Sequence, residues 1–341
     1  MFDLNTIVRP NILALKPYSS ARDEFKGTAT AYLDANENPF GTLNRYPDPL
    51  QKQLKDKLSE IKNIATENIF VGNGSDEAID LCFRIFCEPG KDKALTFTPT
   101  YGMYKVSADI NNVALYEVPL DQNFQIDFEN SLPLLKDDKL KLVFLCSPNN
   151  PTGNILQNVE IILQNFSGIV VVDEAYIDFS DTFSLSQKLD QYPNLIILQT
   201  LSKAWGLAAA RVGLAFANEP IIKLFNKVKP PYNISRLNYE AALLALENSD
   251  AVEEQKQLLL SERARLVSDL AQLSITKKIY PTDANFVLVE VTDADAIYTA
   301  LVDKGIILRN RNTVVPGCLR VTVGTPQENT LLINTLKSLQ L

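Results

Sequence analysis

The 341-residue sequence contains no histidine. An enzyme with this composition has no imidazole for a Ser-His-Asp triad or a zinc site, so its protons must move through Lys, Tyr, Asp, Glu or Cys. The sequence also lacks any apolar run near the ~20 residues of a membrane helix. Its first residues lack the basic start and apolar core of a secretory signal. We therefore expect a cytoplasmic protein that has no membrane contact.

Positive charge is scarce as well. The chain has 33 Lys and Arg against 41 Asp and Glu, a net charge of −8, which argues against nucleic acid as a partner. The four cysteines form no C-x-x-C pair and are expected to be reduced core residues. A P-loop is also missing, which excludes that mode of nucleotide binding. An anionic ligand would have to be held by a local cluster of arginines and backbone amides.

Apolar runs alternate with amphipathic patterns over the first two thirds of the chain. The strand-like runs are 68–72, 93–99, 141–148, 168–176 and 194–202, and helical patterns lie at 75–87, 101–111 and 157–166. This alternation predicts an α/β fold with a largely parallel, buried sheet that is flanked by helices.

The pattern changes beyond residue 235. A long charged helix is expected at 250–272, followed by strands at 285–291 and 318–323. The last helix should begin at Thr325-Pro326-Gln327-Glu328, because this is a capping box with proline at the first helical position. We therefore expect a large domain at 40–235 and a smaller α+β domain formed by 1–39 and 236–341.

Three polar residues follow different strands of the expected sheet. Asn149, Asp173 and Lys203 each come at or just after the end of an apolar run. Ligands of open α/β sheets bind beyond the carboxyl ends of the strands, so an amide, a carboxylate and an amine are expected at one edge. This convergence is stronger evidence for a site than any single motif.

Lys203 would ordinarily be interpreted as a solvated surface residue. Its context, TLSKAWGLAAARVG at 200–213, favours another interpretation, because Ser202 precedes it and Arg211 follows eight residues later. An amine that lies close to an anion-binding hydroxyl and guanidinium suits an aldehyde carrying a phosphate. These residue types predict pyridoxal 5'-phosphate (PLP), with Lys203 as its Schiff-base lysine.

Asp173, within VVVDEAY, is either a buried structural carboxylate or the partner of a cation. A protonated pyridine nitrogen is such a cation, and pairing with Asp173 would strengthen PLP as an electron sink. Tyr176 and Asn149 would contact the phenolic oxygen of the cofactor, although Tyr176 could equally be a core tyrosine with a satisfied hydroxyl.

The segment VGNGSDEAIDL joins a strand to a helix through glycines at 72 and 74. The amides of Ser75 and Asp76 then lie at the N-terminus of a helix, where anions bind, although an ordinary helix cap would have the same sequence. Tyr101, after Pro99, would either stack on the cofactor ring or pack in the core.

Eight ordered motifs match a known pattern. They are LDANENPFG at 33–41, RYPDP at 45–49, GNGSDEAIDL at 72–81, PTYGMY at 99–104, CSPNNPTGN at 146–154, VVVDEAYIDF at 170–179, TLSKAWGLAAARVG at 200–213 and CLRVTVGT at 318–325. Together they resemble the histidinol-phosphate aminotransferase family of fold-type-I PLP enzymes over nearly the whole chain. The resemblance implies a mostly parallel seven-stranded sheet in the large domain and a homodimer.

The resemblance also implies roles for individual residues. Lys203 would carry the cofactor and move the substrate proton, Asp173 would pair with the pyridine nitrogen, and Tyr101 would stack on the ring. The residues implied to hold the cofactor phosphate are Ser75, Asp76, Ser202, Arg211 and, from the partner subunit, the residue matching Tyr46.

The implied substrates are histidinol phosphate and glutamate, with 2-oxoglutarate and imidazole-acetol phosphate as products. Arg320 would hold the α-carboxylate of glutamate. Arg309 and Tyr18, the latter from the partner subunit, would hold the substrate phosphate, and Asn36 matches a further substrate position. Arg311 competes with Arg309 for the phosphate, because the loop 309–317 looks shorter than is usual in the family.

Three alternatives remain open at this point. A phosphothreonine decarboxylase shares the fold and most cofactor motifs, and an aromatic amino-acid aminotransferase differs only in the pocket for the ring. The third alternative, a PLP-sensing regulator, requires an attached DNA-binding module, and no such segment is recognisable in the sequence.

Overall fold

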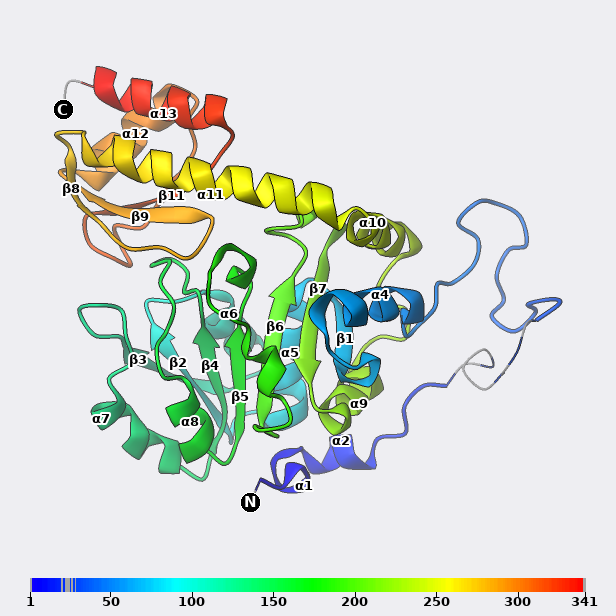
Figure 1. The fold of residues 1–341 in the computed structure, drawn as a ribbon. Coiled ribbons are helices and arrows are strands. Elements are labelled where there is room, and N and C mark those ends of the chain that lie inside the picture. Colours follow the sequence, from blue (N-terminus) through cyan, green and yellow to red (C-terminus); the bar gives the residue numbers. More distant parts are fainter. Residues whose placement is uncertain (1, 20, 22–24, 26, 28, 340–341) are drawn as a thin grey trace.

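A seven-stranded sheet forms the centre of the computed structural model, which describes residues 2–19, 21, 25, 27 and 29–339. Its strands are β1 (Ile69–Asn73), β2 (Lys93–Thr98), β3 (Ala114–Pro119), β4 (Leu140–Cys146), β5 (Ile169–Asp173), β6 (Leu195–Thr200) and β7 (Val212–Ala217). Their order is β1-β7-β6-β5-β4-β2-β3 (Figure 1). Strand β7 runs antiparallel to its neighbours β1 and β6, and the other pairings are parallel. The predicted mostly parallel seven-stranded sheet is confirmed.

Helices cover both faces of this sheet. One face carries α4 (Lys52–Lys62), α8 (Glu160–Asn165) and α10 (Arg236–Glu247), and the other carries α5 (Ser75–Phe86), α6 (Met103–Ile110) and α9 (Glu219–Val228). Alternate residues of β5 therefore enter different cores. Val170 and Val172 join the first, and Ile169 and Val171 join the second, all at most 1% exposed. Burial on both faces explains why these strands read as continuous apolar runs.

The shorter elements lie around this layer. They are α1 (Leu4–Ile7), α2 (Pro10–Ala14), α7 (Phe128–Ser131) and the 3₁₀ turns η1 (Thr66–Asn68), η2 (Leu132–Lys136), η3 (Ile177–Phe179), η4 (Leu185–Lys188) and η5 (Ala208–Ala210). Residues 29–46, which precede α4, lie to one side, away from the sheet (Figure 1).

A smaller antiparallel sheet follows in the chain. Its strands, β8 (Thr276–Ile279), β9 (Phe286–Val291), β10 (Arg309–Asn310) and β11 (Cys318–Thr322), are arranged in the order β10-β11-β9-β8. Helices α11 (Ser249–Ala271), α12 (Ala294–Asp303) and α13 (Pro326–Ser338) pack with it. Helix α11 reaches from α10 to this second sheet (Figure 1). The domain limits 40–235 and 236–341 stay a prediction.

The capping box of the last helix is confirmed. The Thr325 hydroxyl accepts a hydrogen bond from the Glu328 amide at 3.2 Å, and the Glu328 carboxylate accepts one from the Thr325 amide at 2.8 Å. Both bonds satisfy amides that a helix start would otherwise leave without a partner.

Strands β3, β7, β8 and β10 were not among the expected strands. Strand β7 contains the small residue Gly213, which lies against the start of α5. A Cβ added to Gly213 would lie 2.1 Å from the amide nitrogen of Ser75. The small residues after the lysine motif thus allow a strand to approach the N-terminus of a helix closely.

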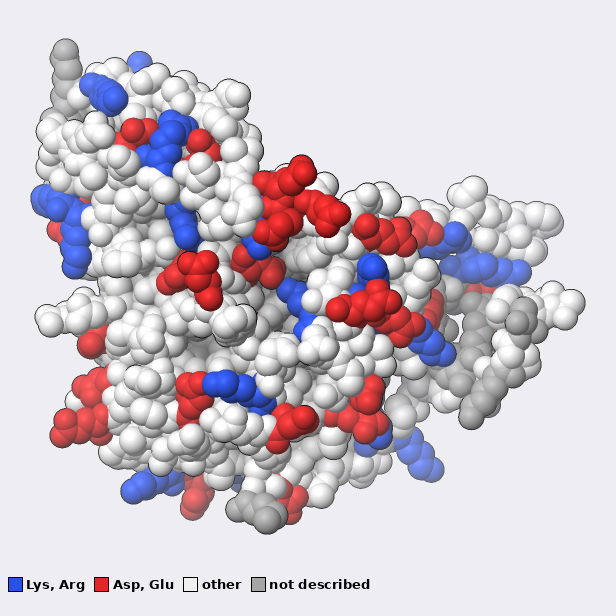
Figure 2. Space-filling model, in the orientation of Figure 1, with Lys and Arg blue, Asp and Glu red and all other residues white. Residues whose placement is uncertain are grey.

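Charge of both signs is spread over the face seen in Figure 2, with acidic side chains gathered where α10 meets α11. Asp250 and Glu253 belong to this acidic stretch, at the start of α11. Among the residues that the structure describes, none of the helices combines the length and apolarity needed to cross a bilayer.

Candidate active site

Asp173 forms the floor of a cavity at the carboxyl edge of the large sheet. It ends β5, and only 2% of its surface is exposed. One carboxylate oxygen accepts a hydrogen bond from the Ala175 amide at 3.1 Å, and the other accepts one from the Tyr104 hydroxyl at 2.8 Å. Burial raises the pKa of Asp173 to about 6, while these two hydrogen bonds and the charge of Lys203 act against burial. Such a buried carboxylate favours a cationic partner.

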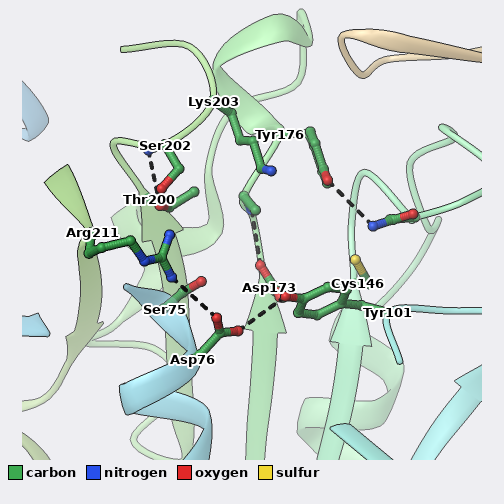
Figure 3. Close-up of a pocket in the computed structure, with 12 residues that line it drawn as sticks. Ser75, Asp76, Tyr101, Cys146, Asp173, Tyr176, Thr200, Ser202, Lys203 and Arg211 are labelled. Carbon is green, nitrogen blue, oxygen red and sulfur yellow. Dashed lines mark hydrogen bonds and ion pairs between the residues drawn. The ribbon is translucent and has the colours of Figure 1, made fainter. Parts of the chain in front are cut away.

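Lys203 lies in the turn after β6 and points into the same cavity, between Arg211 and Tyr176 (Figure 3). Its amine nitrogen is 5.6 Å from the centroid of the Tyr176 ring. Burial is the main cause that lowers the pKa of Lys203, and the charges of Arg320 and Arg211 lower it further, against the opposing effect of Asp173. A lowered pKa makes more of this amine neutral, and only the neutral amine is a nucleophile or base.

The anion-binding end of the cavity is built from the start of α5 and the turn after β6. Gly74, with φ of 73°, leads into α5, and its amide donates to the carbonyl oxygen of Arg211 at 2.8 Å. The Arg211 guanidinium lies 3.4 Å from the Asp76 carboxylate. Opposite, the Thr200 hydroxyl accepts a hydrogen bond from the Ser202 amide at 3.1 Å. Free amides of α5, a guanidinium and two hydroxyls suit a phosphate.

Two tyrosines form the aromatic walls. The Tyr101 hydroxyl donates to Asp76 at 3.1 Å, which holds the ring over the cavity (Figure 3). Tyr176 is 7% exposed, and its ring packs edge-on against Phe286 with centroids 5.1 Å apart. The Tyr176 hydroxyl accepts a hydrogen bond from Asn150 at 3.4 Å. One wall is therefore free to stack on a planar ligand, and the other presents a hydroxyl.

Asn149 does not line the cavity, contrary to the sequence-based expectation. Its amide group donates to the carbonyl oxygen of Pro99 at 2.8 Å and to Thr152 at 2.7 Å, and its oxygen accepts from Thr100 at 3.0 Å. The next residue, Asn150, lines the cavity instead. Asn149 thus holds the loop together, and its predicted contact to the cofactor stays a prediction.

Arg320 reaches the site from β11 of the smaller sheet. Its Nη1 donates to Asn150 at 2.5 Å, and its guanidinium lies 5.1 Å from the Phe286 ring centroid. Within the described part of the chain, its buried Nε has no hydrogen-bond partner, and the same is true of the buried Nε of Arg311. Arg309 is exposed and pairs with Arg320 across β10 and β11. Three guanidiniums thus lie near one another, and burial lowers the pKa of both Arg320 and Arg311.

Three predicted residues lie away from the cavity. Tyr18 is 70% exposed, and Asn36 is also exposed, in the segment between α2 and α4. Tyr46 is 50% exposed and stacks on Tyr232 with ring centroids 4.3 Å apart. These positions in one chain leave the sequence-based roles of the three residues as predictions.

The cavity brings together eight of the predicted residues and four others. Its lining consists of Ser75, Asp76, Tyr101, Cys146, Asn150, Asp173, Ala175, Tyr176, Thr200, Ser202, Lys203 and Arg211. About 480 Å³ of empty space, the part open to solvent included, lies among these side chains. Sequence reasoning missed Asn150 and Thr200, although both belong to motifs that it had singled out.

Known proteins share this arrangement. Residues 17–336 match the family model of aminotransferase class I and II. The chain is 53% identical to the histidinol-phosphate aminotransferase of Parabacteroides distasonis, with both chains covered in full. It is 51% identical to that of Cytophaga hutchinsonii, with 99% of each chain covered.

A solved structure agrees. The histidinol-phosphate aminotransferase from Sinorhizobium meliloti, in complex with pyridoxal 5'-phosphate, superposes with a TM-score of 0.77 at 26% identity, over 89% of this chain and 90% of that one. The family model and the full-length relatives agree with the family that the eight motifs indicate. The chain therefore belongs to the histidinol-phosphate aminotransferase family, within aminotransferase class I and II.

Proposed function

We propose that this protein uses pyridoxal 5'-phosphate to interconvert histidinol phosphate and 2-oxoglutarate with imidazole-acetol phosphate and glutamate, a reaction of histidine biosynthesis. The observation that carries the proposal is a single cavity in which the amine of Lys203 and the carboxylate of Asp173 lie beside an anion-binding helix end.

The residues present fit the cofactor. Asp173 receives its hydrogen bonds from the neutral groups of Tyr104 and Ala175, so a protonated pyridine nitrogen would supply the cation that favours its ionised form. Gly213 leaves the Ser75 amide accessible, because a Cβ there would clash with it. The phosphate would be held by the Ser75 amide, the hydroxyls of Ser202 and Thr200, and the guanidinium of Arg211. We propose these residues, with Asp76, as the cofactor-binding set.

When bound, PLP supplies an aldehyde that condenses with amines and a ring that draws electrons from the substrate's Cα. Lys203 would remove the proton from that Cα and return a proton to C4′ of the cofactor. The lowered pKa of Lys203 keeps part of the amine neutral for this work. Tyr101 would hold the ring plane, and Asn150 and Tyr176 would hydrogen-bond its phenolic oxygen.

Arg320 would bind the α-carboxylate of glutamate. Its Nε is buried without a partner in the part of the chain that the structure describes, and its Nη1 is already oriented by Asn150. A fixed guanidinium with a free N–H suits a carboxylate. We propose Arg309 or Arg311, with Tyr18 of the partner subunit, for the phosphate of histidinol phosphate, and Asn36 for a further contact to the substrate. The nearby positive charges support an anion there.

We also propose a homodimer in which Tyr18 and Tyr46 complete the site of the partner subunit. The exposure of Leu33, at 93%, and of Phe40, at 81%, supports this, because large apolar side chains gathered in one segment indicate an interface. A cytoplasmic location is proposed as well, and cell fractionation with an antibody to the chain tests it.

A decarboxylase is the second candidate. The L-threonine-O-3-phosphate decarboxylase from Porphyromonas gingivalis has the same fold, with a TM-score of 0.72 at 21% identity over 87% of this chain and 90% of that one. Both reactions begin on an amino compound that carries a phosphate. They differ in the bond that breaks at Cα and in the atom that is protonated afterwards.

A substrate panel separates the candidates. The purified, PLP-loaded protein is given histidinol phosphate, phosphothreonine, phenylalanine or tyrosine, each with 2-oxoglutarate, and glutamate and carbon dioxide are both measured. The proposal predicts glutamate formation with the highest kcat/KM for histidinol phosphate. Carbon dioxide release from phosphothreonine would identify a decarboxylase, and a preference for phenylalanine or tyrosine would identify an aromatic aminotransferase.

A further inference from the structure

Tyr104 lies directly beneath the cavity and is fully buried, at 0% exposed. It belongs to α6, and its hydroxyl donates to a carboxylate oxygen of Asp173 at 2.8 Å. Burial, and next the charge of Asp173, raises the pKa of Tyr104 well above the ordinary value of a phenol. The hydroxyl therefore keeps its proton and remains a donor over the whole working range of pH.

The ring of Tyr104 is held by two other rings. It stacks on Phe144 of β4, with centroids 4.9 Å apart and planes at 20°. Its edge meets Tyr101, with centroids 5.7 Å apart and planes at 86°. Tyr104 thus touches both the residue expected to pair with the cofactor nitrogen and the residue expected to stack on the cofactor ring.

We propose that Tyr104 is a positioning residue, which acts through Asp173 to keep that carboxylate ionised and aimed into the cavity. The Ala175 amide binds the other oxygen of Asp173, so the two donors together fix the plane of the carboxylate. Removal of the Tyr104 hydroxyl leaves a buried carboxylate with one donor less. The inference rests on the proposed function only in one respect, which is that Asp173 pairs with the pyridine nitrogen of the cofactor.

Several charged or titratable groups face Asp173, and they determine how the loss of the hydroxyl depends on pH. Six groups interact electrostatically with the Asp173 carboxylate, namely Tyr101, Tyr104, Cys146, Tyr176, Asp76 and Lys203. Only Lys203 is a cation among these six, and it belongs to the opposite wall. A hydrogen bond from Tyr104 is therefore a main support of the ionised form.

The sign of the effect follows from linkage. The pKa of Asp173, about 6 in the folded chain, lies above the ordinary value of 3.8 for an aspartate, so the folded state loses stability as pH rises through this interval. Without the Tyr104 hydroxyl, the pKa of Asp173 in the folded chain is higher still, so the folded state goes on losing stability up to a higher pH. Removal of the hydroxyl should therefore lower the free energy of unfolding more strongly above about pH 6. Below pH 5 the effect should be small, because Asp173 then carries its proton with or without the Tyr104 hydroxyl.

The test is Tyr104→Phe, which keeps both ring contacts and removes only the hydroxyl. Tyr192→Phe is the matched control, because Tyr192 is a 7%-exposed tyrosine of the same domain whose hydroxyl accepts from Gln164 and Gln191. Urea unfolding of the full-length apo-protein is followed at pH 5 and pH 8, at one protein concentration. For Tyr104→Phe, the unfolding constant should rise roughly tenfold more at pH 8 than at pH 5. Tyr192→Phe should change it equally at both.

Kinetics and a second substitution locate the effect. Tyr104→Phe should lower kcat about tenfold and leave the KM for glutamate within about twofold. In an Asp173→Asn background, the pH dependence should vanish, because the carboxylate is gone. The proposal is overturned if Tyr104→Phe changes stability equally at both pH values, as the control does, or if its pH dependence persists beside Asp173→Asn.

A readout that keeps the hydroxyl at position 104 covers the case in which Tyr104→Phe does not fold. With 3-fluorotyrosine at position 104, the fluorine resonance of the apo-protein should titrate with a midpoint near 6, the pKa of Asp173, and Asp173→Asn should abolish that titration. A resonance that does not titrate contradicts the proposal. These measurements need no substrate, so a failure of the proposed aminotransferase reaction would leave their outcome readable.

Discussion

The guanidinium of Arg320 donates a hydrogen bond to the side-chain oxygen of Asn150 at 2.5 Å. This bond connects strand β11 of the small antiparallel sheet to the loop that follows β4 of the large sheet. Asn150 in turn donates to the Tyr176 hydroxyl at 3.4 Å. The proposed carboxylate-binding group and the proposed cofactor contacts are thus joined through one asparagine. The orientation of Arg320 therefore depends on a residue of the other sheet.

Asn150→Ala should therefore impair catalysis more than folding. It removes one hydrogen bond to a charged group, so kcat/KM for glutamate should fall roughly 10- to 100-fold, with a melting temperature near that of the wild type. Steady-state kinetics and thermal unfolding measure the two effects.

Asn149→Ala is the matched comparison. Its amide group holds Pro99, Thr100 and Thr152, so its loss should lower the free energy of unfolding by about 1–3 kcal/mol. Molecules that remain folded should keep most of their activity. If Asn149→Ala damages catalysis in stable protein while Asn150→Ala does not, the cofactor contact belongs to Asn149 after all.

Arg320→Gln should raise the pKa of Lys203. The charge of Arg320 is the second cause, after burial, that lowers this pKa, so its removal makes the ammonium form persist to higher pH. The rate at which the apo-protein captures pyridoxal 5'-phosphate should then reach half its maximum several tenths to about one pH unit higher. Arg236→Gln, on the exposed side of α10, should leave the midpoint unchanged. A midpoint that stays or falls in Arg320→Gln would show that the arginine does not act on Lys203.

Glu174→Gln tests a buried carboxyl that the proposed reaction does not use. Glu174 is 3% exposed and accepts hydrogen bonds from Ser184, Leu185 and Gln199. Burial raises the pKa of Glu174 to about 7, so the wild type loses stability as pH rises from 4.5, the ordinary pKa of a glutamate, through 7.

The variant lacks this titration. Its stability relative to the wild type should therefore increase between pH 5 and pH 8, by an amount of order 2–3 kcal/mol. Urea unfolding across this range measures it. A difference that does not depend on pH would mean that Glu174 stays ionised throughout.

Mixed dimers test whether sites are shared. Lys203→Ala and Tyr46→Phe should each be nearly inactive or strongly impaired alone. If Tyr46 completes the partner's site, a mixed dimer contains one intact site, and random reassociation of equal amounts should restore about a quarter of wild-type activity. Activity equal to the average of the two separate variants would contradict a shared site.

The interior of the fold could be predicted because its pattern is local. Strand β5 is a run of apolar residues that ends in Asp173, and burial on both faces requires such a run. Edge strand β3 is only partly buried, so it lacks a continuous apolar signal. Strand β7 is apolar and fully buried, but it begins inside the lysine motif at 200–213, which was interpreted as a ligand-binding segment. Strand β8 carries two exposed lysines and is equally hard to recognise.

The site was predictable where a single polar motif residue ends a strand, as Asp173 does, or follows one closely, as Lys203 does. Asn149 and Asn150 are neighbours of the same type, and only the path of the loop decides which of them faces the cavity. Tyr104 was not recognisable from the sequence, because its importance lies in a 2.8 Å contact with a residue 69 positions away. Contacts of this kind depend on how α6 packs against the sheet.

The central claim is that Lys203 transfers the substrate proton on bound PLP. Glutamate, added alone to the PLP-loaded protein, tests it most directly, because absorbance then follows conversion of the cofactor to its pyridoxamine form. We predict complete conversion with one 2-oxoglutarate per site, and a rate roughly 10²- to 10⁴-fold lower, or none, in folded Lys203→Ala. No conversion in the wild type, or an undiminished rate in Lys203→Ala, would contradict the account.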